Sequence, residues 1–118
     1  MREIFDDRRQ EPRFSTSGTV RFALEGLHYD AAVLDLSLNG VKVSRPEGWS
    51  PAKGERYRVE IEIPGADRFA AEIVLVYLDD AELGLEFHDM PPRDFTVLRS
   101  LIEHHARLKQ AQAGLSPA

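Results

Sequence analysis

The sequence contains no cysteine, no long apolar run and no signal-peptide pattern. Without cysteine the chain can form neither disulfides nor thiolate–metal sites, which fits a reducing compartment. No apolar run approaches the roughly 20 residues that a membrane-spanning helix needs. The first residues, MREIFDDRRQ, have no apolar stretch of signal-peptide length. We therefore expect a cytoplasmic protein without membrane insertion.

A basic excess is also missing. The 118 residues include 15 Lys and Arg against 20 Asp and Glu, which gives a net charge of −5 and a pI near 5.3. Proteins that bind nucleic acid through its phosphates usually carry a basic face and a high pI. We therefore expect no general binding of DNA or RNA, while a local basic pocket for one small anion stays open.

The common motifs of catalysis are absent from the sequence. It has no Gly-x-Ser-x-Gly, no Walker loop, no His-Glu-x-x-His and no dinucleotide fingerprint. Its four histidines are scattered, and His104 and His105 would point about 100° apart on a helix, so they cannot chelate one ion. His105 shares an apolar helix face and is interpreted as a partly buried packing residue. We expect no enzyme activity, no metal site and no cofactor.

After Pro12, short stretches of alternating apolar and polar residues predict β-strands. Turn signals separate them: Gly26, SLNG, the loop RPEGWSPAKGE and PGAD. About six short strands with few helices between them predict a mainly β fold, a small six-stranded antiparallel barrel of the Greek-key or split type. The expected strands lie in residues 19–25, 31–44 (two strands around a turn), 55–64, 68–78 and 82–89.

The hydrophobic period changes at the end of the chain. From Phe95 to Leu108 apolar residues recur at three- and four-residue spacing, which predicts an amphipathic helix packed on the barrel. Pro91 and Pro92 suit its start and Gly114 its end. We therefore expect a flexible arm over residues 1–13, one barrel domain with its helix over residues 14–112, and a frayed tail over residues 113–118.

The stretch DLSLNG, between two expected strands, has two interpretations. In the first it is a turn only: Asp35, Ser37 and Asn39 cap backbone groups, and Gly40 supplies a positive φ angle. In the second it is a guanine site, in which the carboxylate accepts hydrogen bonds from the N1–H and N2–H₂ edge. The hydroxyl then adds a contact, and the glycine lets the base approach the backbone. Taken alone, the stretch favours the first interpretation, because such turns are common in antiparallel proteins.

The stretch DDRRQEPRFS has a similar ambiguity. It places Arg8, Arg9 and Arg13 among three acidic residues, and mixed charges near a terminus usually form a solvated face. Arginine nevertheless offers a planar fork of donors that suits phosphate and the O6/N7 edge of guanine. Two or three charge-assisted bonds of about 1.5–3 kcal/mol each would support micromolar binding after the cost of ordering a mobile segment.

The two motifs together point to a family. Arg9-x-x-x-Arg13 precedes the first strand, and Asp35-x-Ser37-x-x-Gly40 follows about two strands later, in a barrel that ends in a helix. In this conjunction the chain resembles a PilZ domain, the bacterial receptor for cyclic di-GMP. The resemblance runs from RRQEPR through DLSLNG and ELGLEF to the terminal helix. It implies nucleotide binding in second-messenger signalling that regulates motility and biofilm formation.

The resemblance also implies which residues bind the ligand. In the family the arginine motif grips phosphates and guanine edges, a role that carries over to Arg9 and Arg13. The Asp-Ser-Gly turn recognises a guanine, a role that carries over to Asp35, Ser37 and Gly40.

Two further positions follow from the resemblance. Arg8 precedes the arginine motif, where the residue influences whether one ligand molecule or a stacked pair is bound, and an arginine favours the pair. Tyr77 ends the expected strand beside the ligand, and for it base stacking and core packing are about equally expected.

Glu11 is expected to pair with the arginines in the empty site, in exposed ion pairs worth only about 0–1 kcal/mol.

The function implied is a receptor that binds cyclic di-GMP and relays its level to an unidentified effector protein. We expect the N-terminal arm to fold over the barrel when the ligand binds, which changes a surface that the partner reads. The alternative is a PilZ-like adaptor that binds proteins and no nucleotide, with the arginines left as surface charge. The C-terminal helix and the loop containing Trp49 are the candidate partner surfaces.

Overall fold

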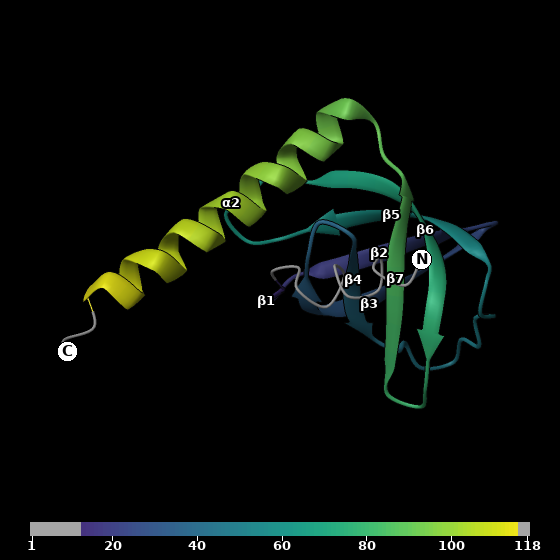
Figure 1. Cartoon of the computed structure of the whole chain (residues 1–118). Coiled ribbons are helices and arrows are strands. Elements are labelled where there is room, and N and C mark those ends of the chain that lie inside the picture. The colour runs from purple at the N-terminus through teal and green to yellow at the C-terminus, as the bar shows by residue number, and fades with distance from the viewer. Residues whose placement is uncertain (1–12, 116–118) are drawn as a thin grey trace, which may run out of the picture.

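A computed structural model describes residues 13–115 of the chain, with side chains as far as Leu108. Strands make up just under half of this range, and one helix follows them (Figure 1). In chain order the elements are β1 (Phe14–Ser15), β2 (Thr19–Leu24), β3 (Leu27–Leu36), β4 (Gly40–Ser44), β5 (Arg56–Glu62), β6 (Phe69–Leu78), β7 (Glu82–Asp89) and α2 (Pro92–Leu115).

The strands form a closed antiparallel barrel. The order β3-β2-β5-β6-β7-β4 is closed by the pairing of β4 with β3, and β1 adds to the outside of β3. This confirms the predicted six-stranded barrel with a C-terminal helix. Closure satisfies the backbone groups of the strand edges within the molecule.

Alternation along each strand fills the interior. In β5, for example, Val59 and Ile61 are fully buried while Arg58 and Glu60 face outward, as the period of two predicts. The same rule applies around the barrel and gives one continuous core. Its largest fully buried side chains are Phe22, Phe69, Leu36, Ile61, Ile73, Leu75, Leu83 and Leu98.

Two strands differ from the expectation. β3 begins at Leu27 instead of Ala31, directly after a tight turn in which Gly26 has a φ of 73°. Residues 27–30 are mostly exposed and are held by pairing with β2, for example Arg21 opposite Asp30, so no apolar alternation marks them. β1 has only two residues, which is too short to produce a hydrophobic period.

The helix α2 begins at Pro92, as expected, and continues one residue beyond Gly114 to Leu115. It packs on the barrel through Leu98, Leu101 and Ile102, which are buried. The Asp94 carboxylate fixes the first turn by accepting a hydrogen bond from the backbone N–H of Ala70 in β6 (2.7 Å).

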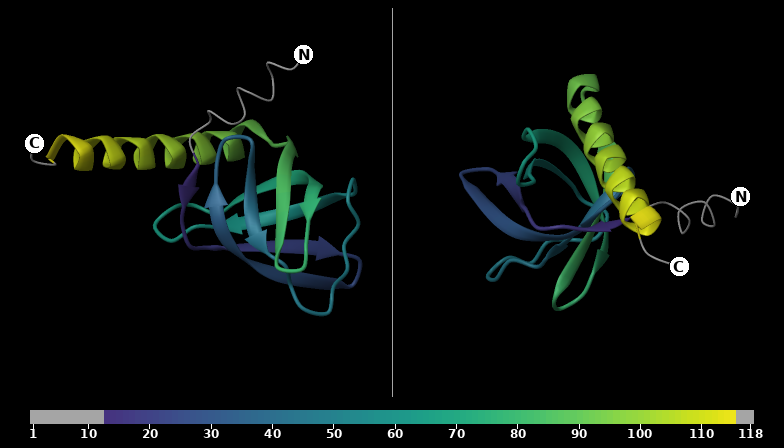
Figure 2. Two further views of the ribbon diagram at one scale, coloured as in Figure 1. Left: turned by 60° about the horizontal axis from the view of Figure 1, so that its bottom comes forward. Right: turned by 90° about the vertical axis from the view of Figure 1, so that its left-hand side faces the viewer.

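Beyond these residues the helix runs past the barrel, as Figures 1 and 2 show. Leu108, on the expected apolar face, is accordingly 47% exposed. No helix in the described part of the chain is both long and apolar enough to cross a membrane.

The long loop between β4 and β5 folds back onto the barrel. Its Trp49 stacks on Tyr29 at 4.9 Å between ring centroids and meets Phe22 and Tyr57 edge-on. Trp49 is therefore a partly buried extension of the core.

Candidate functional site

The described part of the arginine motif lies directly against the turn motif. Arg13 immediately precedes β1, and β1 pairs with the end of β3, where Ser15 lies opposite Asp35. The guanidinium donates from Nε and Nη2 to Asp35 Oδ1 (3.1 and 2.9 Å) and from Nη1 to Ser37 Oγ (3.3 Å). One arginine thus joins two motifs more than twenty residues apart. Arg8, Arg9 and Glu11 lie outside the described residues.

Ser37 is the centre of the β3–β4 turn. Its side chain is fully buried, and Oγ accepts hydrogen bonds from the backbone N–H groups of Asn39 and Gly40 (3.2 and 3.3 Å). Its own backbone N–H donates to the Gly40 carbonyl (2.9 Å). The serine therefore performs the turn chemistry expected from the sequence and meets Arg13 at the same time.

The reason that the first interpretation gives for the glycine at position 40, a positive φ angle, is wrong. Gly40 is not among the glycines with a positive φ. It is needed because β4 and β7 approach closely there: a Cβ on Gly40 would collide with the backbone carbonyl of Leu85. The space that a side chain would need is therefore occupied by β7.

Two irregularities turn Asp35 and Tyr77 toward the outside. The β3–β4 register shifts between Val33 and Asp35, and the β6–β7 register shifts between Leu75 and Tyr77. In a regular strand Asp35 would point to the same, buried side as Val33, and Tyr77 to the same, buried side as Leu75. An extra residue at each shift reverses the alternation, which is the ordinary use of a β-bulge beside a site.

Tyr77 is 46% exposed, so it is not a core residue. Two contacts hold its side chain: close packing against the Gly84 backbone and a hydrogen bond from its hydroxyl. A Cβ on Gly84 would lie 2.9 Å from the Tyr77 Cβ, so the tyrosine occupies the space that the glycine leaves. Its hydroxyl donates to Asp79 Oδ2 (2.6 Å), and this bond raises the pKa of Tyr77.

A groove of about 240 Å³ lies between these groups. It contains three of the expected site residues, Arg13, Gly40 and Tyr77, and it also contains residues that the sequence did not single out. Lys42 and Gly84 are two of these unpredicted residues. They could not be predicted because the strand pairing that brings them to the groove with Tyr77 has no local sequence signal. The remaining lining residues are Asn39, Val41, Val76, Leu85 and Glu86.

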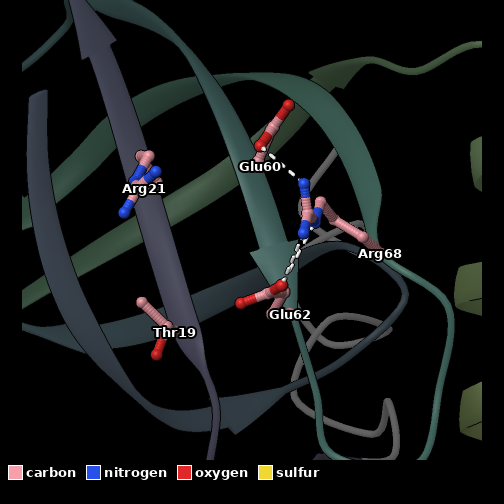
Figure 3. A pocket seen from close by; sticks show the side chains of 5 residues that line it. All are labelled: Thr19, Arg21, Glu60, Glu62 and Arg68. Atoms are coloured by element: carbon pink, nitrogen blue, oxygen red, sulfur yellow. Dashed lines mark hydrogen bonds and ion pairs between the residues drawn. The ribbon is translucent and has the colours of Figure 1, made fainter.

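A second polar hollow, of about 220 Å³, lies on the outer face of β2 and β5 (Figure 3). There the charges neutralise one another. Arg68 pairs with Glu60 and Glu62 (3.7 and 2.9 Å), and Arg21 pairs with Asp30 (2.9 Å). Exposed pairs of this kind form a solvated ladder, so this hollow is a weaker candidate than the groove beside Arg13.

The histidines are not assembled into a site. His105 is partly buried and stacks on Phe14 at 5.2 Å between ring centroids, which confirms its packing role. Among the described residues, no three His, Asp or Glu side chains are grouped as a metal ion would require.

Comparison with known proteins identifies the barrel. The family model that describes the PilZ domain matches residues 7–104. The chain belongs to the PilZ domain family. The matched range contains the arginine motif, the DLSLNG turn and most of the described helix. A comparison with curated proteins finds no match to the sequence.

Solved structures share the fold of this PilZ domain. Escherichia coli YcgR in complex with c-di-GMP has a TM-score of 0.76 at 19% identity, covering 91% of this chain and 50% of that one. The PilZ domain of YcgR with c-di-GMP has a TM-score of 0.68 at 20% identity, covering 92% and 99%. The Bacillus subtilis inhibitor of motility, MotI/DgrA, has a TM-score of 0.71 at 21% identity, covering 88% and 52%. The chain thus spans about half the length of MotI/DgrA and of the first YcgR structure.

Proposed function

We propose that this PilZ domain is a receptor for cyclic di-GMP and that the nucleotide binds in the groove beside Arg13. The observation that carries the proposal is the bridge from Arg13 to Asp35 and Ser37, because it brings both motifs to one edge of one groove. The c-di-GMP complexes of YcgR, which share this fold, support the choice of ligand.

The Arg13–Asp35 contact suggests how the nucleotide enters. Arg13 offers Asp35 two adjacent N–H groups, and the N1–H and N2–H₂ edge of guanine offers the same pattern. A guanine can therefore replace the guanidinium on Asp35 and leave Arg13 free to contact a phosphate. The side chains of the pair are 40% and 22% exposed, so breaking it costs little, on the order of 1 kcal/mol.

Three further residues complete the proposed site. The exposed ring of Tyr77 faces the groove and supplies a stacking surface for a base. Arg8 and Arg9 supply the remaining guanidinium groups of the motif. With three arginines the site has cations for a stacked pair of ligand molecules.

The relay to an effector protein is proposed to begin at β1. Phe14 follows Arg13 directly and stacks on His105 of α2. A ligand that pulls Arg13 away from Asp35 acts on the same two-residue strand that touches the helix. We propose that ligand binding changes the position of α2 and that the effector protein recognises this change at the surface of the helix.

Isothermal titration calorimetry with cyclic di-GMP tests the proposal. Arg13→Ala removes one charge-assisted contact worth about 1.5–3 kcal/mol, so we expect binding at least about tenfold weaker. Arg21→Ala is the matched control, because Arg21 is also an exposed, carboxylate-paired arginine but lies in the second hollow. The molar ratio at saturation distinguishes one ligand molecule from a pair.

The adaptor alternative predicts a different result. It is favoured by the fact that Arg13, Asp35 and Ser37 satisfy one another without a ligand. If the wild-type protein gives no binding heat with cyclic di-GMP, or if Arg13→Ala binds like Arg21→Ala, the receptor proposal is wrong and the adaptor remains.

A further inference from the structure

One row of paired positions crosses four strands at the groove. Asp35 in β3 lies opposite Lys42 in β4, Lys42 lies opposite Gly84 in β7, and Gly84 lies opposite Tyr77 in β6. Residues paired across antiparallel strands point to the same face of the sheet. The row therefore places a carboxylate, a cation, a position without a side chain and an aromatic ring next to one another on the outside of the barrel.

Because Gly84 has no side chain, the Tyr77 ring lies over it: a Cβ at position 84 would meet Tyr77 Cβ, Cγ and Cδ2 at 2.9, 3.7 and 3.8 Å. The ring therefore covers the β7 position that is paired with Lys42. Lys42 and Tyr77 line the same groove. A nucleotide has matching parts, since its base is a flat ring for stacking and its phosphate is an anion for a cation.

Lys42 is only weakly engaged by the protein itself. Its Nζ lies 3.6 Å from Glu82 Oε1, and the two side chains are 40% and 38% exposed. An exposed pair at this separation contributes only about 0–1 kcal/mol. A phosphate in the groove can therefore take the place of Glu82 at little cost.

We propose that Lys42 is a further phosphate-binding residue of the groove, across Gly84 from the stacking ring of Tyr77. This inference rests on the proposed function and adds a cation that neither motif contains. It also assigns Glu82 a role as the carboxylate that competes with the phosphate for Lys42.

The first test is calorimetric titration of cyclic di-GMP into Lys42→Met, which keeps an unbranched apolar stem and removes the charge. A lost charge-assisted contact of about 1.5–3 kcal/mol predicts binding weaker by roughly 10- to 150-fold, and added salt should weaken the variant less than the wild type. Lys42→Arg should bind within a few-fold of the wild type. Lys53→Met, in the exposed β4–β5 loop, is the control for removing one lysine charge elsewhere.

The second test separates ligand binding from a structural ion pair. Glu82→Gln removes the competitor, so it should tighten binding by a few-fold while Lys42→Met weakens it. A purely structural pair would instead lower the melting temperature in both variants and change affinity in the same direction. Thermal unfolding of each variant therefore accompanies the titrations.

The outcomes also separate this inference from the proposed function. If Arg13→Ala loses binding but Lys42→Met binds as Lys53→Met does, the role of Lys42 is overturned while the receptor proposal stands. If the wild-type protein does not bind cyclic di-GMP, both are overturned.

Discussion

Ser37 is the residue on which the turn of the site depends most. Its buried Oγ accepts from two backbone N–H groups, those of Asn39 and Gly40, and a methyl group cannot do this. We expect Ser37→Ala to lower the free energy of unfolding by about 1–3 kcal/mol, measured by denaturant titration. Ser17→Ala, at an exposed position before β2, should change it by less than about 0.5 kcal/mol. Equal stability of the two variants would show that the backbone groups of the turn find other acceptors.

Gly84 and Tyr77 form a pair whose energies should not be independent. A methyl group on Gly84 would lie 2.9 Å from the Tyr77 Cβ, so we expect Gly84→Ala to cost about 1–3 kcal/mol as an overpacked contact. In a Tyr77→Ala background the methyl group has room. The cost of Gly84→Ala should then fall by at least about 1 kcal/mol in a double-mutant cycle of unfolding free energies. Additive costs would mean that the glycine is required for another reason.

At the scale of single elements, the regular parts of the structure were predictable and the irregular ones were not. The period of two in RYRVEIE and the apolar spacing of α2 gave the strands and the helix, because burial of one face selects those residues. The bulges before Asp35 and Tyr77 reverse the alternation at single positions. They depend on how two strands pair, which no local period records, so the sequence left Tyr77 undecided between core and surface.

The β6–β7 hairpin is an element with a predicted pH dependence. Asp79 accepts from the Tyr77 hydroxyl and from the backbone N–H groups of Ala81 and Glu82, and these bonds lower the pKa of Asp79. Because the pKa of Asp79 is lower in the folded state than in the unfolded chain, its carboxylate stabilises the fold. This contribution is fully present at pH values above the unfolded pKa, which is near 3.9. That contribution is lost as the pH falls through the folded value.

Unfolding free energy measured from neutral pH down to about pH 3 checks this prediction. Asp79→Asn should reduce the decline on acidification below about pH 4, and Asp80→Asn is the matched control for removing one acidic charge from the same hairpin. A decline in Asp79→Asn as steep as that of the wild type would contradict it.

At the scale of the whole molecule, the site and the helix meet through one aromatic contact. Phe14 lies in β1, beside Arg13 at the groove, and its ring stacks on His105 of α2. A stacked aromatic pair contributes about 0.5–1.5 kcal/mol beyond its buried area. His105 lies beyond the buried residues that hold the helix on the barrel, Leu98, Leu101 and Ile102. The contact with β1 therefore acts on a part of α2 that the core holds less firmly.

Amide hydrogen exchange around His105 tests this connection, because exchange reports local opening of a helix. We expect Phe14→Leu, which keeps an apolar side chain but removes the stack, to speed exchange there by roughly 2- to 10-fold. Arg13→Ala should act in the same direction, since it releases the chain next to Phe14 from Asp35. Tyr29→Leu removes a stack of similar geometry on Trp49, in a contact that includes neither α2 nor β1. If Tyr29→Leu speeds exchange around His105 as much as Phe14→Leu does, the effect is general destabilisation. A selective effect would establish the physical link that a ligand at Arg13 needs in order to reach the helix.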